Sequence, residues 1–198
     1  MENKTNPIML YIRESWLLIV ASLCFGFLLA GVNYALKPKI EANSSAKQNS
    51  ALSTLLTDAV TFEEIVEEDG QPTVFKGLDE NKQSAGWVFK ATGAGYADRI
   101  DLLIAVDSGF EKIVGYQVLF SNETVGFGDK IKDEPFKKQF NSAPVEELEL
   151  LKMGDEEIID NEIVAISGAT ITSNAVVDIF NEYVFSVRNK LREKGLLK

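Results

Sequence analysis

Histidine is absent from this 198-residue chain, and cysteine occurs once, at Cys24. The absence of histidine removes the base of Ser-His-Asp and Cys-His catalytic sites and the commonest ligand of zinc sites. A single cysteine excludes a disulfide framework, a cysteine-ligated iron–sulfur cluster and the Cys-x-x-Cys attachment of haem. Any cofactor of this chain must therefore be held by other side chains.

Basic residues are also scarce, with 20 Lys and Arg against 30 Asp and Glu. The first 36 residues contain two charges of each sign, so the whole net charge of −10 belongs to residues 37–198. A protein that binds nucleic acid needs a basic face for the phosphates, and we expect no such partner here. We interpret the acidic residues of the 146–160 segment as a solvated face, because they lack EF-hand spacing, and expect no metal site.

The longest apolar run, residues 15–36, contains no charged residue. As a helix it would extend roughly 30 Å, which matches the hydrocarbon core of a bilayer. Trp16 and Tyr34 stand near its two ends, where aromatic rings anchor at the membrane interface. The alternative is a cleaved signal peptide, but the run is longer than a usual apolar signal region and no Ala-x-Ala site follows it. We expect an uncleaved transmembrane helix, which the basic residues on both sides do not orient.

Beyond the apolar run, the pattern changes from helical to strand-like. Residues 37–59 carry leucines at helical spacing and predict a stalk helix. Alternating apolar runs predict strands at 61–66, 73–75, 86–91, 100–106, 112–120 and 163–166, and a turn at 107–109 joins two of them as a hairpin. An amphipathic helix is predicted from residue 173 onward. The predicted fold is α+β: one N-terminal transmembrane helix, then a domain over residues 60–198 with a mostly antiparallel sheet and flanking helices.

Two polar segments could carry chemistry. The sequence Ser-Gly-Ala-Thr-Ile-Thr-Ser at 167–173 lies between the last predicted strand and the last helix. It places a hydroxyl at a helix N-terminus, which favours a phosphate, with Thr172 or Ser173 as the expected N-cap. An ordinary capped turn is the alternative. The 121–130 segment contains Gly126 and Gly128, spaced to let the backbone approach a planar ligand.

The order of these features resembles a known family. An N-terminal anchor, a Glu-Thr-x-Gly-x-Gly-Asp-Lys segment and a late Ser-Gly-Ala-Thr-x-Thr-Ser before a terminal helix are similar to the membrane-anchored FMN-binding subunits of two related complexes. These are the G subunit of the Rnf complex and the C subunit of the sodium-translocating NADH:quinone reductase. The resemblance covers nearly the whole chain. The chain is shorter than we expect for the quinone-reductase subunit, which favours the Rnf subunit.

The resemblance implies a covalent cofactor. In that family the last threonine of the motif, here Thr170, carries FMN through a phosphoester bond that a separate flavin transferase makes from FAD. The remaining residues implied at the cofactor are Ser167, Gly168, Ala169, Thr172 and Ser173 around the phosphate and ribityl chain, and Glu123, Thr124, Gly126, Gly128 and Tyr96 near the flavin. No catalytic residue beyond this cofactor site, and no independent substrate site, is expected.

The sequence departs from the family at three positions. Val164 stands where the family usually has an aspartate that the transferase reads, six positions before the modified threonine. Ser121 replaces a frequent histidine, and Val125 replaces a proline. All three departures leave the acceptor Thr170 in place.

The resemblance also implies a cellular role. Residues 1–14 would lie in the cytoplasm and the flavin domain on the outer or periplasmic side of a bacterial or archaeal cell membrane. The chain would carry electrons in a ferredoxin:NAD oxidoreductase coupled to Na⁺ or H⁺ translocation, with integral membrane, iron–sulfur and flavin subunits as partners. The alternatives are the subunit of the quinone reductase, an anchored flavoprotein of an extracellular electron-transfer or regulatory system, and an interaction domain without flavin.

Overall fold

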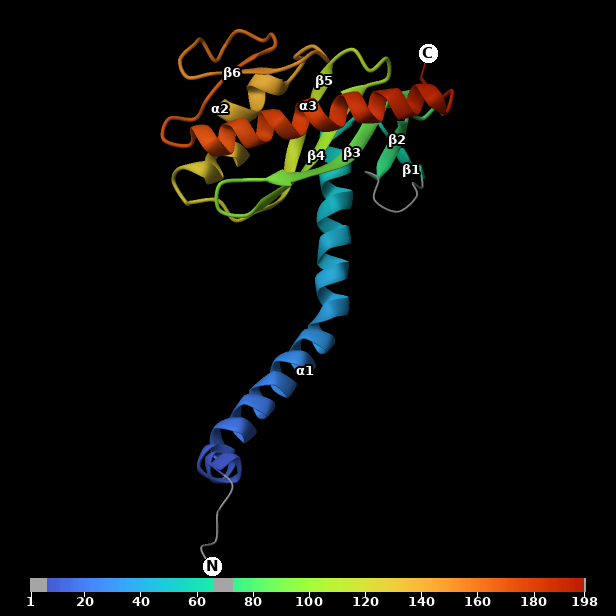
Figure 1. Ribbon diagram of the computed structural model, residues 1–198. Coiled ribbons are helices and arrows are strands. Elements are labelled where there is room, and N and C mark those ends of the chain that lie inside the picture. Colours follow the sequence, from blue (N-terminus) through green and yellow to red (C-terminus); the bar gives the residue numbers. More distant parts are fainter. Residues whose placement is uncertain (1–6, 66–72, 198) are drawn as a thin grey trace, which may run out of the picture. The chain divides into compact units, whose positions relative to one another are not determined.

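The computed structural model describes residues 7–65 and 73–197 (Figure 1). The chain divides into two compact units, Met1–Ala46 and Lys47–Lys198. Helix α1 (Pro7–Leu55) supplies the first unit and continues into the second. Its Ser15–Leu55 part contains an 18-residue window of mean hydropathy 2.2, so it is long and apolar enough to cross a membrane. Both predicted helical segments, 15–36 and 37–59, fall largely on α1.

The second unit is built on a five-stranded antiparallel sheet in the order β1-β2-β3-β4-β5. The strands are β1 (Thr61–Ile65), β2 (Val74–Leu78), β3 (Ser84–Ala94), β4 (Arg99–Asp107) and β5 (Ile113–Ser121). Strand β4 is buried on both faces, because Leu102 and Ile104 belong to one apolar cluster and Leu103 to another. Its nearly continuous apolar run is typical of a strand covered on both sides.

Helices cover both faces of this sheet. Helix α3 (Thr170–Glu193) packs Val176, Ile179 and Phe180 against one face and lies across β3 and β4 in Figure 1. The last turn of α1 packs Leu52 and Leu55 against the other face. The apolar periodicity of both helices therefore marks the side that each buries.

Short elements connect β5 to α3. They are η1 (Gly128–Lys132), α2 (Glu134–Lys137), η2 (Lys138–Phe140), β6 (Glu149–Leu151) and β7 (Glu162–Val164). Strands β6 and β7 form a separate parallel pair that the sequence did not predict. The α+β layout with a mostly antiparallel sheet and flanking helices is confirmed. The strand predicted at 163–166 ends at Val164, and Val66, the last residue of the first predicted strand, lies outside the described residues.

Candidate functional site

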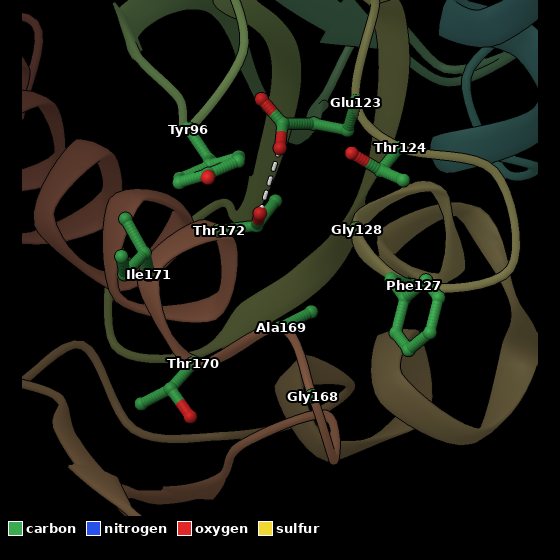
Figure 2. Close-up of a pocket in the computed structure, with 10 residues that line it drawn as sticks. All are labelled: Tyr96, Glu123, Thr124, Phe127, Gly128, Gly168, Ala169, Thr170, Ile171 and Thr172. Carbon is green, nitrogen blue, oxygen red and sulfur yellow. Dashed lines mark hydrogen bonds between the residues drawn. The ribbon is translucent and has the colours of Figure 1, made fainter.

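A pocket of about 570 Å³ opens where three segments of the second unit meet (Figure 2). One is the turn between β3 and β4, the second is the segment that follows β5, and the third is the start of α3. The lining residues are Tyr96, Glu123, Thr124, Phe127, Gly128, Gly168, Ala169, Thr170, Ile171 and Thr172. The volume lies within the range of pockets that hold small ligands and cofactors.

The turn of residues 166–173 is closed by its own hydrogen bonds. The Ala169 N–H donates to the Ile166 carbonyl at 2.9 Å. The buried Ser173 hydroxyl accepts from the Ile166 N–H and donates to the Ala169 carbonyl, each at 3.0 Å. The predicted N-cap at Thr172 or Ser173 is wrong: the N-cap of α3 is Ala169, and no side chain caps this helix end. Ser173 was available for capping by residue type, but its hydroxyl fastens the turn to the strand end instead.

Thr170 is the first residue of α3 and is exposed at the wall of the pocket. The first N–H groups of a helix have no partner within the helix, and the helix dipole adds about half a positive charge there. No side chain caps this N-terminus, so these N–H groups remain available to a ligand at the start of α3. An anion attached at Thr170 would therefore lie at the positive end of α3.

The strand before this turn is fixed by a buried amide. The Gln139 Oε1 accepts from the Val164 N–H at 2.7 Å, and the Gln139 Nε2 donates to the Val164 carbonyl at 3.3 Å. Both residues are buried. The side chain of Gln139 thus pairs with Val164 as a neighbouring strand would, and holds the end of β7 from which the 166–173 turn starts.

The segment after β5 folds back by short turns. Gly126 has a φ of +81°, and its N–H donates to the Asp129 carboxylate at 2.7 Å. The segment is anchored to the core where the Tyr116 hydroxyl donates to the Ile131 carbonyl at 2.6 Å. Burial raises the pKa of Tyr116 well above its ordinary value, and the charge of Glu134 raises it further, so the hydroxyl stays protonated and donates.

Glu123 is the one charged side chain among the ten lining residues, and only 6% of it is exposed. Its Oε1 accepts from the Ala97 N–H at 3.0 Å and its Oε2 accepts from the Thr172 hydroxyl at 2.7 Å (Figure 2). Among the described residues it forms no ion pair. A single carboxylate therefore ties together the three segments that form the pocket.

Glycines let the segments that form the pocket approach closely at two places. A Cβ at Gly128 would lie 2.8 Å from the Thr172 Oγ1 and 2.9 Å from the Glu123 Oε2. Gly168 has a φ of +79°, and a Cβ there would lie 2.9 Å from the Phe127 ring. Only glycine fits these approaches without displacing a neighbour.

The pocket collects eight of the eleven residues expected at the cofactor. Of the other three, Ser167 lines a neighbouring cavity of about 330 Å³, and Ser173 is buried beneath the turn. Gly126 has open space around it. Sequence reasoning missed Phe127 and Ile171, which line the pocket while 52% and 61% exposed. The only signal for them was a large apolar residue inside each polar motif.

Comparison with known proteins identifies the family of the domain that contains this pocket. Residues 95–184, which include every lining residue, match the FMN-binding domain family. The chain is 33% identical to the G subunit of an ion-translocating oxidoreductase complex from Methanosarcina acetivorans over 173 residues, which cover 84% of this chain and 89% of that protein. The chain belongs to this family of G subunits, as its motifs predicted.

Two further G subunits are similar. The chain is 31% identical to the G subunit of a proton-translocating ferredoxin:NAD(+) oxidoreductase complex from Clostridium ljungdahlii, with 83% of this chain and 85% of that protein covered. It is 29% identical to the G subunit of a Na(+)-translocating ferredoxin:NAD(+) oxidoreductase complex from Acetobacterium woodii, with 83% and 86% covered.

Two solved structures share the fold. NqrC from Shewanella oneidensis aligns with a TM-score of 0.53 and 23% identity over 65% of this chain and 66% of that one. The C subunit of a Na⁺-translocating NADH-quinone reductase from Parabacteroides distasonis aligns with a TM-score of 0.53 and 22% identity over 64% and 74% of the two chains. At these identities the likeness concerns the fold alone.

The described residues fit FMN. The pocket is large enough, and glycines let its walls come close. Its apolar lining includes exposed Tyr96, Phe127 and Ile171, which suit a flat aromatic ring, while an uncapped helix N-terminus lies beside Thr170 for the phosphate. When bound, FMN supplies the electron-transfer chemistry, and the protein supplies its position and electrostatic surroundings.

Proposed function

We propose that this chain is a membrane-anchored, electron-carrying flavoprotein subunit with FMN attached to Thr170 through a phosphoester bond. Its complex would be a ferredoxin:NAD oxidoreductase that translocates Na⁺ or H⁺. The observation that carries the proposal is the placement of the Thr170 hydroxyl at the uncapped end of α3, on the wall of a pocket whose described lining residues include no basic side chain.

The charges of the pocket favour covalent attachment. A free phosphate monoester carries about −1.5 to −2 charges near neutral pH, and such groups are usually held by Arg or Lys. None of the ten described lining residues is basic, and Glu123 is acidic. A phosphodiester loses the second ionisation, so the helix N-terminus has less charge to balance, and the covalent bond replaces the missing ion pairs.

Attachment would follow a balanced transfer from FAD. The Thr170 Oγ1 forms a bond to the phosphorus of the FMN half, the bond from that phosphorus to AMP breaks, and AMP leaves. The hydroxyl proton passes to solvent or to the transferase. No electron is exchanged in this step, so the flavin remains oxidised.

The open pocket suits an electron carrier. Tyr96, Phe127 and Ile171 line the pocket and are all more than half exposed. A cofactor bound there would present an edge to a partner protein, and the tether would keep it in place without an enclosing cavity. We place the domain on the outer side of the membrane, with integral membrane, iron–sulfur and flavin subunits as partners.

The sequence relatives support the ferredoxin:NAD complex over the quinone reductase. All three named above are G subunits, whereas the C subunits share only the fold. The two ferredoxin:NAD relatives are named for different ions, so both H⁺ and Na⁺ stay within the proposal.

The test is flavin fluorescence of the denatured chain on a gel after co-expression with a flavin transferase. The wild-type chain should fluoresce and Thr170→Ala should not, whereas Ser108→Ala, which removes an exposed hydroxyl in the β4–β5 turn outside the pocket lining, should fluoresce like the wild type. Fluorescence that persists in Thr170→Ala would overturn the site. A dark wild-type chain would overturn covalent attachment.

A further inference from the structure

Glu123 is a buried acidic residue in the lining of the pocket. It is 6% exposed, and no ion pair with it occurs among the described residues. Burying a carboxylate is costly unless it is paired or well hydrogen-bonded. The desolvation cost of Glu123 falls inside a pocket that would receive a negatively charged cofactor. Packing alone does not explain a carboxylate at this position.

The surroundings hold the carboxylate in one orientation. The Ala97 N–H binds one oxygen and the Thr172 hydroxyl binds the other. Two glycines make room for it: a side chain at Gly95 would collide with Glu123 Oε1, and one at Gly128 would come within 2.9 Å of Glu123 Oε2. In Figure 2 the carboxylate is turned toward Tyr96 and Thr172, within the lining of the pocket.

Some acceptor capacity of this carboxylate is free. An ionised carboxylate has about four lone-pair sites, and the two hydrogen bonds use two of them. The free sites can accept from a ligand's N–H or O–H group, while the charge repels a phosphate. A bound FMN would therefore have its phosphate at the Thr170 end of the pocket and its hydrogen-bond donors at the Glu123 end.

On the basis of the proposed function, we propose that Glu123, held by Thr172, accepts a hydrogen bond from the imide or ribityl part of the flavin and lowers its reduction potential by its charge. Reduction adds electron density to the ring, and a fixed negative charge in a low-dielectric site opposes this. Neutralising the carboxylate should therefore favour the reduced flavin.

The test is the two-electron midpoint potential of the full-length, flavin-loaded chain, measured by dithionite titration in detergent. Dithionite supplies two electrons per flavin, and the accompanying protons come from solvent. We expect Glu123→Gln to bind reduced flavin at least tenfold better relative to oxidised flavin than the wild type does, which is about +30 mV for two electrons. The control Glu149→Gln removes the charge of an exposed glutamate on β6, outside the pocket lining, and should leave the potential unchanged.

Glu123→Gln should fold, because its amide oxygen can accept from Ala97 N–H and its NH₂ can donate to the Thr172 hydroxyl. If it does not, Glu123→Asp keeps the charge and is expected to shift the relative binding by less than threefold. A flavin-loaded Glu123→Gln chain with the wild-type potential would overturn the inference. A tenfold increase in the binding of reduced relative to oxidised flavin in Glu123→Asp would also overturn it.

This outcome is separable from that of the proposed function. Loss of covalent loading in the wild type refutes attachment at Thr170, but the potentials of non-covalently bound flavin still test Glu123. Normal loading with unchanged potentials refutes the role of Glu123 alone.

Discussion

The two segments that form most of the pocket are stabilised in different ways. The 166–173 turn is closed by its own backbone and by Ser173, and Thr170 is left exposed at its end. The 121–130 loop is joined to the other segments through one buried side chain, Glu123. In the proposed function, the turn would provide the point of attachment for FMN, and the loop would provide the electrostatic environment of the flavin.

In this account, attachment of the flavin and adjustment of its reduction potential depend on different segments and can be changed separately. A change at Thr170 removes a hydroxyl that takes part in none of the bonds closing the turn. A change at Glu123 alters charge and contacts but leaves the acceptor in place. Variants of the two segments should therefore fail in different assays, and the following predictions run from the largest expected effect on covalent loading to the smallest.

Thr170→Ala should abolish covalent flavin while leaving the fold intact, because Ala is favourable in a helix and no capping bond is lost. Covalent loading is measured by in-gel fluorescence, and folding by the thermal melt of the domain. Thr170→Ser keeps a hydroxyl and should retain part of the loading. A melt lowered by several degrees in Thr170→Ala would show that the hydroxyl also supports the turn.

Gly128→Ala should destabilise the pocket by about 1–3 kcal/mol, as overpacking does, because the new Cβ would press on Thr172 and Glu123. Covalent loading should fall with it. The matched change Gly126→Ala meets no neighbour and only strains a residue with φ +81°, at about 1–2 kcal/mol. Equal loading in the two variants would contradict the tight approach at Gly128. Urea unfolding and gel fluorescence provide both readouts.

Gln139→Leu should lower the free energy of unfolding by about 2–4 kcal/mol, because it leaves the buried N–H and C=O of Val164 without partners. Since β7 leads into the 166–173 turn, loading should slow as well. Chemical denaturation gives the stability, and a time course of in-gel fluorescence gives the loading rate. A variant as stable as the wild type would show that water or another group replaces the amide.

Tyr116→Phe should cost about 1 kcal/mol at neutral pH through the lost bond to Ile131. Burial raises the pKa of Tyr116 in the folded chain, so its contribution is present below about pH 10 and is lost as the pH rises above that value. The stability gap between the wild type and Tyr116→Phe should therefore narrow at high pH. Urea unfolding followed by Trp fluorescence at several pH values checks this, and a constant gap would contradict it.

Local patterns were sufficient for most of the fold. The alternating runs of β3, β4 and β5 and the turn at 107–109 predicted the centre of the sheet, and the apolar face of α3 predicted the final helix. A strand was predicted at the position of β7, but its partner β6 was not, because its three residues are too few for a periodicity. The N-cap prediction was wrong because the helix begins at Thr170, which places Ser173 inside its first turn, where the hydroxyl bonds to Ile166 and Ala169.

The candidate site could be predicted from the sequence only in part. The resemblance named Glu123 and Thr172, but their contact joins residues 49 positions apart, and the Ala97 contact joins residues 26 apart. Such pairings depend on how the segments meet in space, which no local pattern encodes. Phe127 and Ile171 were missed for the same reason, because an exposed apolar residue indicates a binding site only when it is seen to line a pocket.

The most direct test of the account is mass spectrometry of peptides from the full-length chain isolated from membranes after co-expression with its transferase. We predict that the peptide containing residues 167–173 carries the mass of FMN less one water, and that fragmentation assigns it to Thr170. An unmodified 167–173 peptide, with all flavin released by denaturation, would contradict the account.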